Sequence, residues 1–202
     1  MSQPGPLPGA VVYPVTVDFQ SDAPVKRWSP LVNWLLAIPH FVVLIGLIIV
    51  WYFVVLISLF TILFTKQIPD GLYNFAVMVL RYQWRVTSYA VFLRSDYPPF
   101  EFPAQAMDPG NDPAVLSVAR PTEYQRFMPL IKWLLAIPHF IVLYFLGIAA
   151  GVVVLIGFFA VLFTGKWPDG LRTFLIGYYR WSYRVTGYAT LLVDEYPPFS
   201  LE

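Results

Sequence analysis

The sequence predicts an all-α membrane protein of two tandem repeats, each a kinked helix plus a return helix, preceded by a short extended N-terminal arm. Hydrophobic residues form 58% of the 202 residues and charged residues only 12%, whereas soluble domains carry about 25% charge. Residues 27–100 also align without a gap to residues 126–199, with 39 of the 74 positions identical. We therefore expect an arm, a first membrane repeat, a linker and a second membrane repeat over residues 1–25, 26–100, 101–123 and 124–202.

The composition excludes several classes of function. Thirteen basic and twelve acidic residues leave no basic excess for binding nucleic acid, so no nucleic-acid partner is expected. Cysteine is absent, which excludes disulfides, iron–sulfur clusters and thiol catalysis. The sequence contains no phosphate loop, nucleophile elbow, metalloprotease helix or glycine-rich dinucleotide turn. We expect neither enzymatic activity nor a bound cofactor.

The arm and the linker lack the pattern of membrane helices. Residues 1–25 contain five prolines and no lysine or arginine, so they lack the basic opening of a secretory signal and are interpreted as an extended arm. Residues 11–19 partly alternate in polarity and suit a short strand, which Pro14 restricts to a sheet edge. Residues 101–123 are rich in Pro, Asp and Gly and are typical of a surface linker.

The first helical segment of each repeat is too long for one straight membrane span. Residues 30–65 carry no formal charge, and a straight helix of that length extends about 54 Å, against a hydrocarbon thickness of about 30 Å. Proline inside a helix removes a backbone hydrogen bond and bends the helix. We therefore expect breaks at Pro39 and Pro138, each between a short interfacial helix and a long spanning helix. The alternative is a hairpin that turns inside the bilayer.

The predicted return helix, residues 71–93 in the first repeat, carries an arginine stripe. Arg81 and Arg85 lie four residues apart on one helical face, as do Arg180 and Arg184 in the second repeat. We expect these four side chains to point away from lipid tails, because charge is unfavourable at the bilayer centre. Two guanidinium groups on one face suit an anionic lipid headgroup. Alternatively, they snorkel to the membrane interface or bind backbone carbonyls, water or local carboxylates: Asp70, Asp96, Asp169, Asp194 or Glu195.

The two histidines, His40 and His139, occupy equivalent positions in the repeats. Two related imidazoles are a candidate pair of ligands for a metal or a haem. The alternative is a polar side chain that binds a carbonyl freed at the helix break. A zinc site needs three or four protein ligands, and the sequence shows no such cluster.

Two further motifs recur in both repeats. The sequence Pro-Asp-Gly predicts a turn, because proline fixes φ and glycine permits positive φ; it contains Asp70, Gly71, Asp169 and Gly170. The closing sequence Tyr-Pro-Pro-Phe does not fit a helix interior, so we expect it to cover a neighbouring surface. Its residues include Tyr97, Pro98, Pro99, Tyr196, Pro197 and Pro198.

These motifs together resemble the bacterial membrane family known as domain of unknown function 4389. The resemblance rests on W-L-L-A-I-P-H-F, L-F-T, P-D-G-L, R-x-x-x-R-V-T-x-Y-A and Y-P-P-F, and it covers both repeats. It implies a membrane fold and provides no mechanism.

The function expected from these features is that of a non-catalytic integral protein of the cell membrane. It would act as a scaffold or as an accessory subunit of a larger complex, with membrane lipids and other membrane subunits, or copies of itself, as partners. One alternative is a small transporter or channel with the arginines between the repeats. Another is a lipid-modifying enzyme or a redox subunit that uses the two histidines. Both repeats are expected to share one backbone about a pseudo-two-fold axis.

Overall fold

The computed structural model describes residues 13–202, so the first twelve residues of the predicted arm lie outside the described part. Each repeat contains a 28-residue helix, α2 (Ile38–Thr65) or α5 (Ile137–Thr164). A 21-residue return helix follows, α3 (Asp70–Ala90) or α6 (Asp169–Ala189). Short segments precede the long helices: α1 (Ser29–Leu36) in the first repeat, and η1 (Met128–Leu130) with α4 (Lys132–Leu135) in the second.

Two short strands correct the all-α prediction. Strand β1 (Val15–Phe19) pairs antiparallel with β2 (Ala114–Val118), with Val17 opposite Leu116. In β1 alternate residues are buried, as a strand with one face against a core requires. The strand in the arm follows the alternation seen in the sequence. The strand in the linker was missed, because the Pro, Asp and Gly residues before it dominate the composition of residues 101–123.

Each long helix begins just before its proline. Helix α1 ends at Leu36, and α2 starts at Ile38, so Pro39 lies in the first turn of α2. Pro138 has the same place in α5. Proline is well tolerated there because the first N–H groups of a helix have no partner within the helix. Helix α5 then continues without interruption through residues 147–151, where the hairpin alternative requires a turn.

The Pro-Asp-Gly motifs start helices, which corrects the turn prediction. Asp70 and Asp169 are the first residues of α3 and α6, where a carboxylate interacts favourably with the helix dipole. The left-handed residues of these connections come earlier, at Lys66 and Gly165, which terminate α2 and α5 with φ of 57° and 74°. The motif therefore specifies a helix N-terminus, with the sharp reversal placed a few residues before it.

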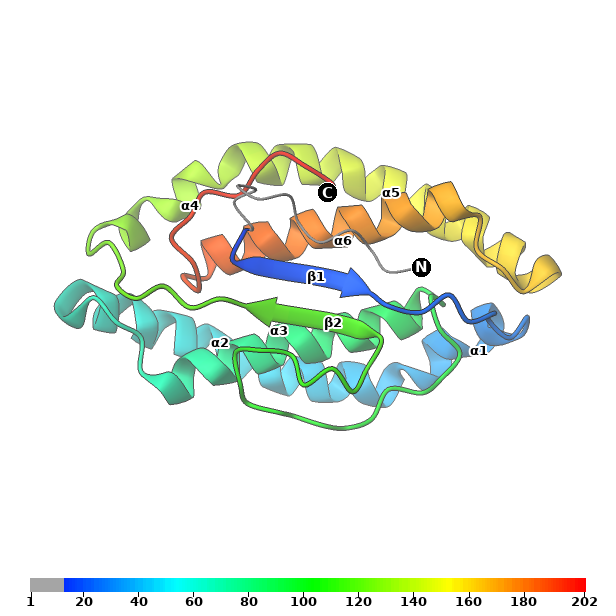
Figure 1. The fold of residues 1–202 in the computed structure, drawn as a ribbon, viewed down its shortest axis with the longest axis horizontal. Helices are drawn as coiled ribbons and strands as arrows, with labels where there is room; N and C mark the ends of the chain where they lie inside the picture. Colours follow the sequence, from blue (N-terminus) through cyan, green and yellow to red (C-terminus); the bar gives the residue numbers. More distant parts are fainter. Residues whose placement is uncertain (1–12) are drawn as a thin grey trace.

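The helices are layered behind the strands. The sheet lies in front of α3 and α6 at the middle of the long axis (Figure 1). Helix α3 packs between β2 and α2, and α6 packs between β1 and α5. Followed by colour in Figure 1, α2 runs opposite to α5, and α3 runs opposite to α6. These opposed directions, with the antiparallel strands, are the arrangement that a two-fold axis through the sheet produces.

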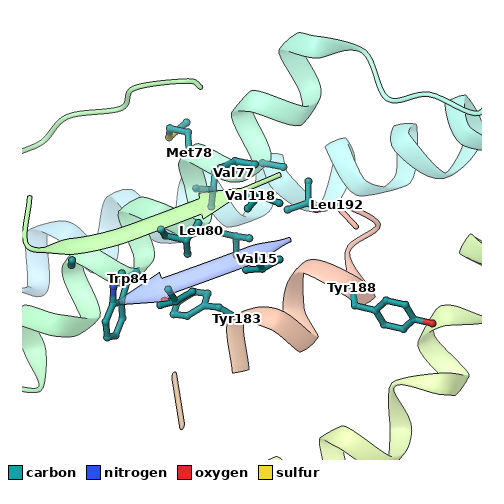
Figure 2. Packing of buried hydrophobic residues seen from close by; sticks show 14 of the residues in the cluster. Val15, Val77, Met78, Leu80, Trp84, Val118, Tyr183, Tyr188 and Leu192 are labelled. Atoms are coloured by element: carbon teal, nitrogen blue, oxygen red, sulfur yellow. The ribbon is translucent and has the colours of Figure 1, made fainter. Parts of the chain in front are cut away.

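The core lies where the two return helices meet the sheet (Figure 2). Trp84 of α3 is fully buried and contacts Tyr179 and Tyr183 of α6, with ring centroids 5.3 and 5.9 Å apart. Its Nε1 donates to the carbonyl of Asp18 in β1 at 3.0 Å. One aromatic side chain therefore joins both repeats to the arm.

The repeats differ in the short segment before each long helix, which corrects the expectation of one shared backbone. The equivalent residues Asn33 and Lys132 are both fully buried. Asn33 donates from Nδ2 to the carbonyls of Tyr89 and Arg94, both at 3.0 Å. Lys132 instead donates from Nζ to the carbonyl of Val193 and to Asp194, both at 2.6 Å. Asn33 anchors the short segment to the end of the return helix and the chain after it, whereas Lys132 anchors it to the chain after the return helix alone.

Candidate functional site

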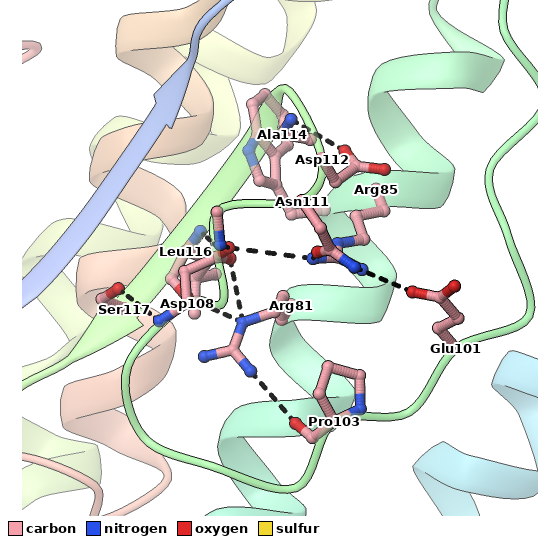
Figure 3. Close-up of polar contacts among 12 residues, drawn as sticks. Arg81, Arg85, Glu101, Pro103, Asp108, Asn111, Asp112, Ala114, Leu116 and Ser117 are labelled. Carbon is pink, nitrogen blue, oxygen red and sulfur yellow. Dashed lines mark hydrogen bonds and ion pairs between the residues drawn. The ribbon is translucent and has the colours of Figure 1, made fainter.

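The two arginines of α3 are buried and held by protein groups (Figure 3). Arg81 and Arg85 are each 1% exposed. The Nε of Arg81 lies 3.0 Å from the carbonyl of Leu116 and 3.0 Å from Oδ2 of Asp108. Its Nη atoms donate to three further carbonyls, those of Pro103, Gln105 and Ala106. Arg81 thus fixes the segment that leads from the first Tyr-Pro-Pro-Phe motif into β2.

Asp108 is the carboxylate shared by both arginines. Its side chain is 2% exposed, and its Oδ1 lies 3.7 Å from Nη2 of Arg85. Its Oδ2 also accepts the N–H of Leu116 at 3.0 Å. Burial lowers the pKa of Arg81, and the charge of Asp108 opposes this effect. Because arginine stays protonated in proteins, the buried positive charges depend on this carboxylate.

The arginines of α6 have fewer partners and greater exposure. Arg180 donates from Nε to the carbonyl of Val17 at 3.0 Å and from Nη1 to the carbonyl of Leu201 at 3.1 Å. Its ion pair with Asp18 is partly exposed, at 25% for the arginine side chain and 53% for the aspartate. Arg184 donates to the carbonyl of Glu202, and its Nε has no partner among the described residues.

Among the described residues, none of the carboxylates expected to pair with the stripe does so, which corrects that expectation, and two of them have other partners. Asp70 pairs with Arg120, and Asp194 pairs with Lys132. Asp108 and Asp18 pair with the arginine stripe instead, although both lie outside the aligned repeats. They reach the stripe because the arm and the linker fold back over α6 and α3 as β1 and β2. No sequence pattern indicated Asp108, because the strand β2 that follows it was not predicted.

The closing Tyr-Pro-Pro-Phe motif covers the histidine of its own repeat. His40 stacks on Phe100 with ring centroids 4.1 Å apart, and Tyr97 lies 4.6 Å away. His139 stacks on Phe199 at 3.9 Å, with Tyr196 at 4.9 Å. The motif was expected to cover a neighbouring surface, and in each repeat it lies over the start of the long helix.

The two imidazoles have different hydrogen-bond partners. The Nδ1 of His40 lies 2.6 Å from the hydroxyl of Tyr82. The Nδ1 of His139 accepts a hydrogen bond from Nε1 of Trp181 at 3.0 Å. Each Nε2 is buried without a partner in the described structure. Each histidine is enclosed by aromatic side chains of its own repeat, so their partners do not bring the two imidazoles together at one site.

This difference predicts the tautomer of His139. Tryptophan Nε1 can only donate, so neutral His139 must keep Nδ1 unprotonated and carry its proton on Nε2. We expect ¹⁵N NMR of imidazole-labelled protein to show the Nε2–H tautomer at His139. Replacing Trp181 with phenylalanine removes the constraint and should give a mixture of tautomers. An Nδ1–H signal at His139 in the unsubstituted protein would contradict the hydrogen bond.

The described part of the chain contains two open surface hollows away from these residues. One lies between residues 21–25 and the α5–α6 connection, and includes Lys166 and Arg172. The other is lined by residues near Glu123 and Asp194. Within residues 13–202, no three His, Asp or Glu side chains gather as metal ligands would. Neither hollow includes the arginine stripe or the histidines.

Comparison with known families identifies both repeats. A family model described as a domain of unknown function, DUF4389, matches residues 27–101 and 129–200. No curated protein and no solved structure is significantly similar to the chain. The two matches cover more than half of the chain and contain both long helices, both arginine pairs and both histidines. The chain therefore belongs to the DUF4389 family and contains two tandem copies of its domain.

Proposed function

We propose that the chain is a non-catalytic integral membrane protein that acts as a scaffold or accessory subunit of a larger membrane complex. The surface of the long helices is the observation that supports this proposal. Helices α2 and α5 are each 28 residues long and uncharged, and each exposes twelve large apolar side chains. Both are long and apolar enough to cross a membrane. Soluble monomers rarely expose continuous apolar surface of this extent.

The repeated unit is the membrane module in this proposal. A short apolar segment, a break before Pro39 or Pro138, a long apolar helix and a buried return helix recur in each copy. The arginines, histidines and Tyr-Pro-Pro-Phe motifs then serve mainly to hold each module together. Lipids and neighbouring membrane subunits, or further copies of the chain, would cover the apolar helices.

The test of this proposal is membrane extraction followed by purification in a mild detergent. We expect the protein to stay in membranes washed with carbonate at high pH, and to be released only by detergent. Other membrane subunits, or further copies of the chain, should copurify with it. Release by carbonate would contradict the membrane assignment, and a monomer free of partners would contradict the subunit role.

Anionic lipid binding is proposed for the second repeat alone. Arg81 and Arg85 are each 1% exposed, so a headgroup cannot reach even the Nε and Nη1 of Arg85, which have no partner among residues 13–202, whereas Arg180 and Arg184 are partly exposed. Two guanidinium groups four residues apart lie on one face of α6, and each can donate to phosphate oxygens. A lipid phosphate at this position would accept hydrogen bonds from the accessible N–H groups of the two guanidinium groups.

Native mass spectrometry can measure this lipid binding. Replacing both Arg180 and Arg184 by glutamine is expected to lower retention of anionic phospholipid about tenfold. A tenfold change in affinity corresponds to a loss of about 1.4 kcal/mol of binding free energy. Binding of zwitterionic lipid should not change. Replacing the exposed Arg126 with glutamine is the matched control. Equal retention by the double variant and the control would show that the α6 arginines have only a structural role.

A further inference from the structure

The apolar surface of the long helices covers most of their circumference. On α2 the buried residues form one narrow stripe: His40, Leu44, Trp51, Val54, Ser58 and Ile62. These positions recur every three or four residues and so share one side of the helix. Half-buried side chains such as Leu47 and Val55 flank the stripe, and twelve large apolar side chains on the rest of the helix are exposed; α5 has the same pattern. Each long helix is therefore covered by protein on one side and needs an apolar environment on the others.

The sheet and the segment between α3 and β2 expose polar groups, although this segment also exposes Met107 and Phe102. In β1 the residues between the buried ones, Thr16 and Asp18, are exposed. Glu101 and Asn111, in the segment between α3 and β2, are exposed as well, and the Asn111 amide donates to the Glu101 carboxylate at 2.9 Å. These groups lie on irregular chain or on the outer face of the sheet, where water is their natural partner.

The position of the sheet along the long helices restricts how the molecule can be oriented in a membrane. The strands lie at the middle of the long axis, and the long helices extend beyond the sheet at both ends (Figure 1). If α2 and α5 stood along the membrane normal, the sheet and the polar segment beside it would lie at the depth of the lipid tails. Irregular backbone exposed to lipid does not occur in the hydrocarbon region. An upright orientation therefore places Asp18 and Glu101 in an unsuitable environment.

We propose that the protein is embedded in one leaflet, with α2 and α5 lying along the membrane plane and the sheet facing water. The partner of the apolar helices is then the acyl-chain layer of that leaflet. An interfacial helix normally carries its own polar face. Here α3, α6 and the sheet replace that face, which explains why α2 and α5 are uncharged throughout. This inference rests on the proposed membrane location and specifies its geometry.

The absence of cysteine allows a clean test by single substitutions. Gln67 follows α2 and Lys166 follows α5; they are equivalent in the repeats, exposed, and at opposite ends of the molecule. We expect a membrane-impermeant maleimide to modify Gln67→Cys and Lys166→Cys from the same side of oriented membrane vesicles. Thr16→Cys on the sheet should react from that side too. Modification of the two end positions from opposite sides would overturn the inference.

The depth of α2 in the bilayer provides a second measurement. Val42, Ile49 and Phe60 are exposed and lie on one face of α2, because their spacings are close to whole numbers of helical turns. Spin labels at the three positions should report similar depths if the helix lies in the plane. An upright helix would place the label at position 49 about 10 Å deeper than the other two. That profile would overturn the inference.

Two other outcomes distinguish failure of the in-plane geometry from failure of the proposed membrane location. Release of the unsubstituted protein by a carbonate wash would refute the membrane location itself. A protein that resists the wash, yet is labelled from both sides, would refute only the in-plane geometry. If labels on α2 are shielded from lipid-soluble quenchers and crosslink to a second copy, the apolar face is a dimer interface, and the inference is also wrong.

Discussion

Replacing Asp108 with alanine is expected to destabilise the protein by about 3–5 kcal/mol, the usual effect of removing one partner from a buried ion pair. Arg81 and Arg85 would keep their charge at 1% exposure, and Arg81 would lose a carboxylate 3.0 Å away. Thermal unfolding in detergent should show a loss of Tm on the order of 10 °C.

The second repeat provides the matched control for this experiment. Asp18 pairs with Arg180 at 3.3 Å, but the pair is partly exposed, and such pairs contribute about 0.2–1 kcal/mol. Asp18→Ala should therefore lower Tm much less than Asp108→Ala. Asp108→Asn keeps the shape and the acceptor for the Leu116 N–H, but it removes the charge together with the acceptor for the Gly110 N–H, so its effect combines the two losses. Equal losses of Tm for Asp108→Ala and Asp18→Ala would show that burial does not distinguish the two arginine pairs.

Adding one methyl group at Gly157 is expected to destabilise the second repeat by about 1–3 kcal/mol, as overpacking of a core does. A Cβ at this position would lie 2.1 Å from the ring of Trp167. That ring cannot easily move, because its Nε1 donates to the carbonyl of Phe92 at 3.0 Å and it stacks on the Phe92 ring. Gly157→Ala should therefore lower Tm.

Two comparisons make this prediction specific. Gly151 lies in the same helix with no atom within 4 Å of an added Cβ, so Gly151→Ala should be neutral or stabilise by up to about 1 kcal/mol. In the first repeat, Ser58 takes the position of Gly157 and Ile68 takes the position of Trp167, and both are buried. The larger residue in the helix is thus accompanied by a smaller residue in the connection. Gly157→Ser should therefore lower Tm less in a Trp167→Ile background than in the natural chain. Equal effects in the two backgrounds would disprove direct packing of Trp167 on Gly157.

Local sequence patterns were sufficient to predict the helices. The 99-residue offset, the uncharged run after Pro30 and the position of Pro39 predicted a short segment, a long apolar helix and a return helix in each repeat. These features depend on neighbours within a few residues, through helical periodicity and the fixed φ of proline. The same information placed Arg81 and Arg85 on one face of α3. It also marked the family to which the chain belongs.

The partners of those side chains depended on the tertiary structure. Asp108 lies 27 residues after Arg81, and Asp18 lies 162 residues before Arg180, so no helical or strand period connects them. Their contacts require the linker and the arm to fold back and pair as β2 and β1. The stacking of Phe100 on His40 and of Trp167 on Phe92 likewise joins segments 60 and 75 residues apart. The sequence by itself determined the repeats, the long helices and the arginine faces, because these follow from local geometry. Only the tertiary structure decided which carboxylates and aromatic rings meet them, because such contacts depend on the path of the whole chain.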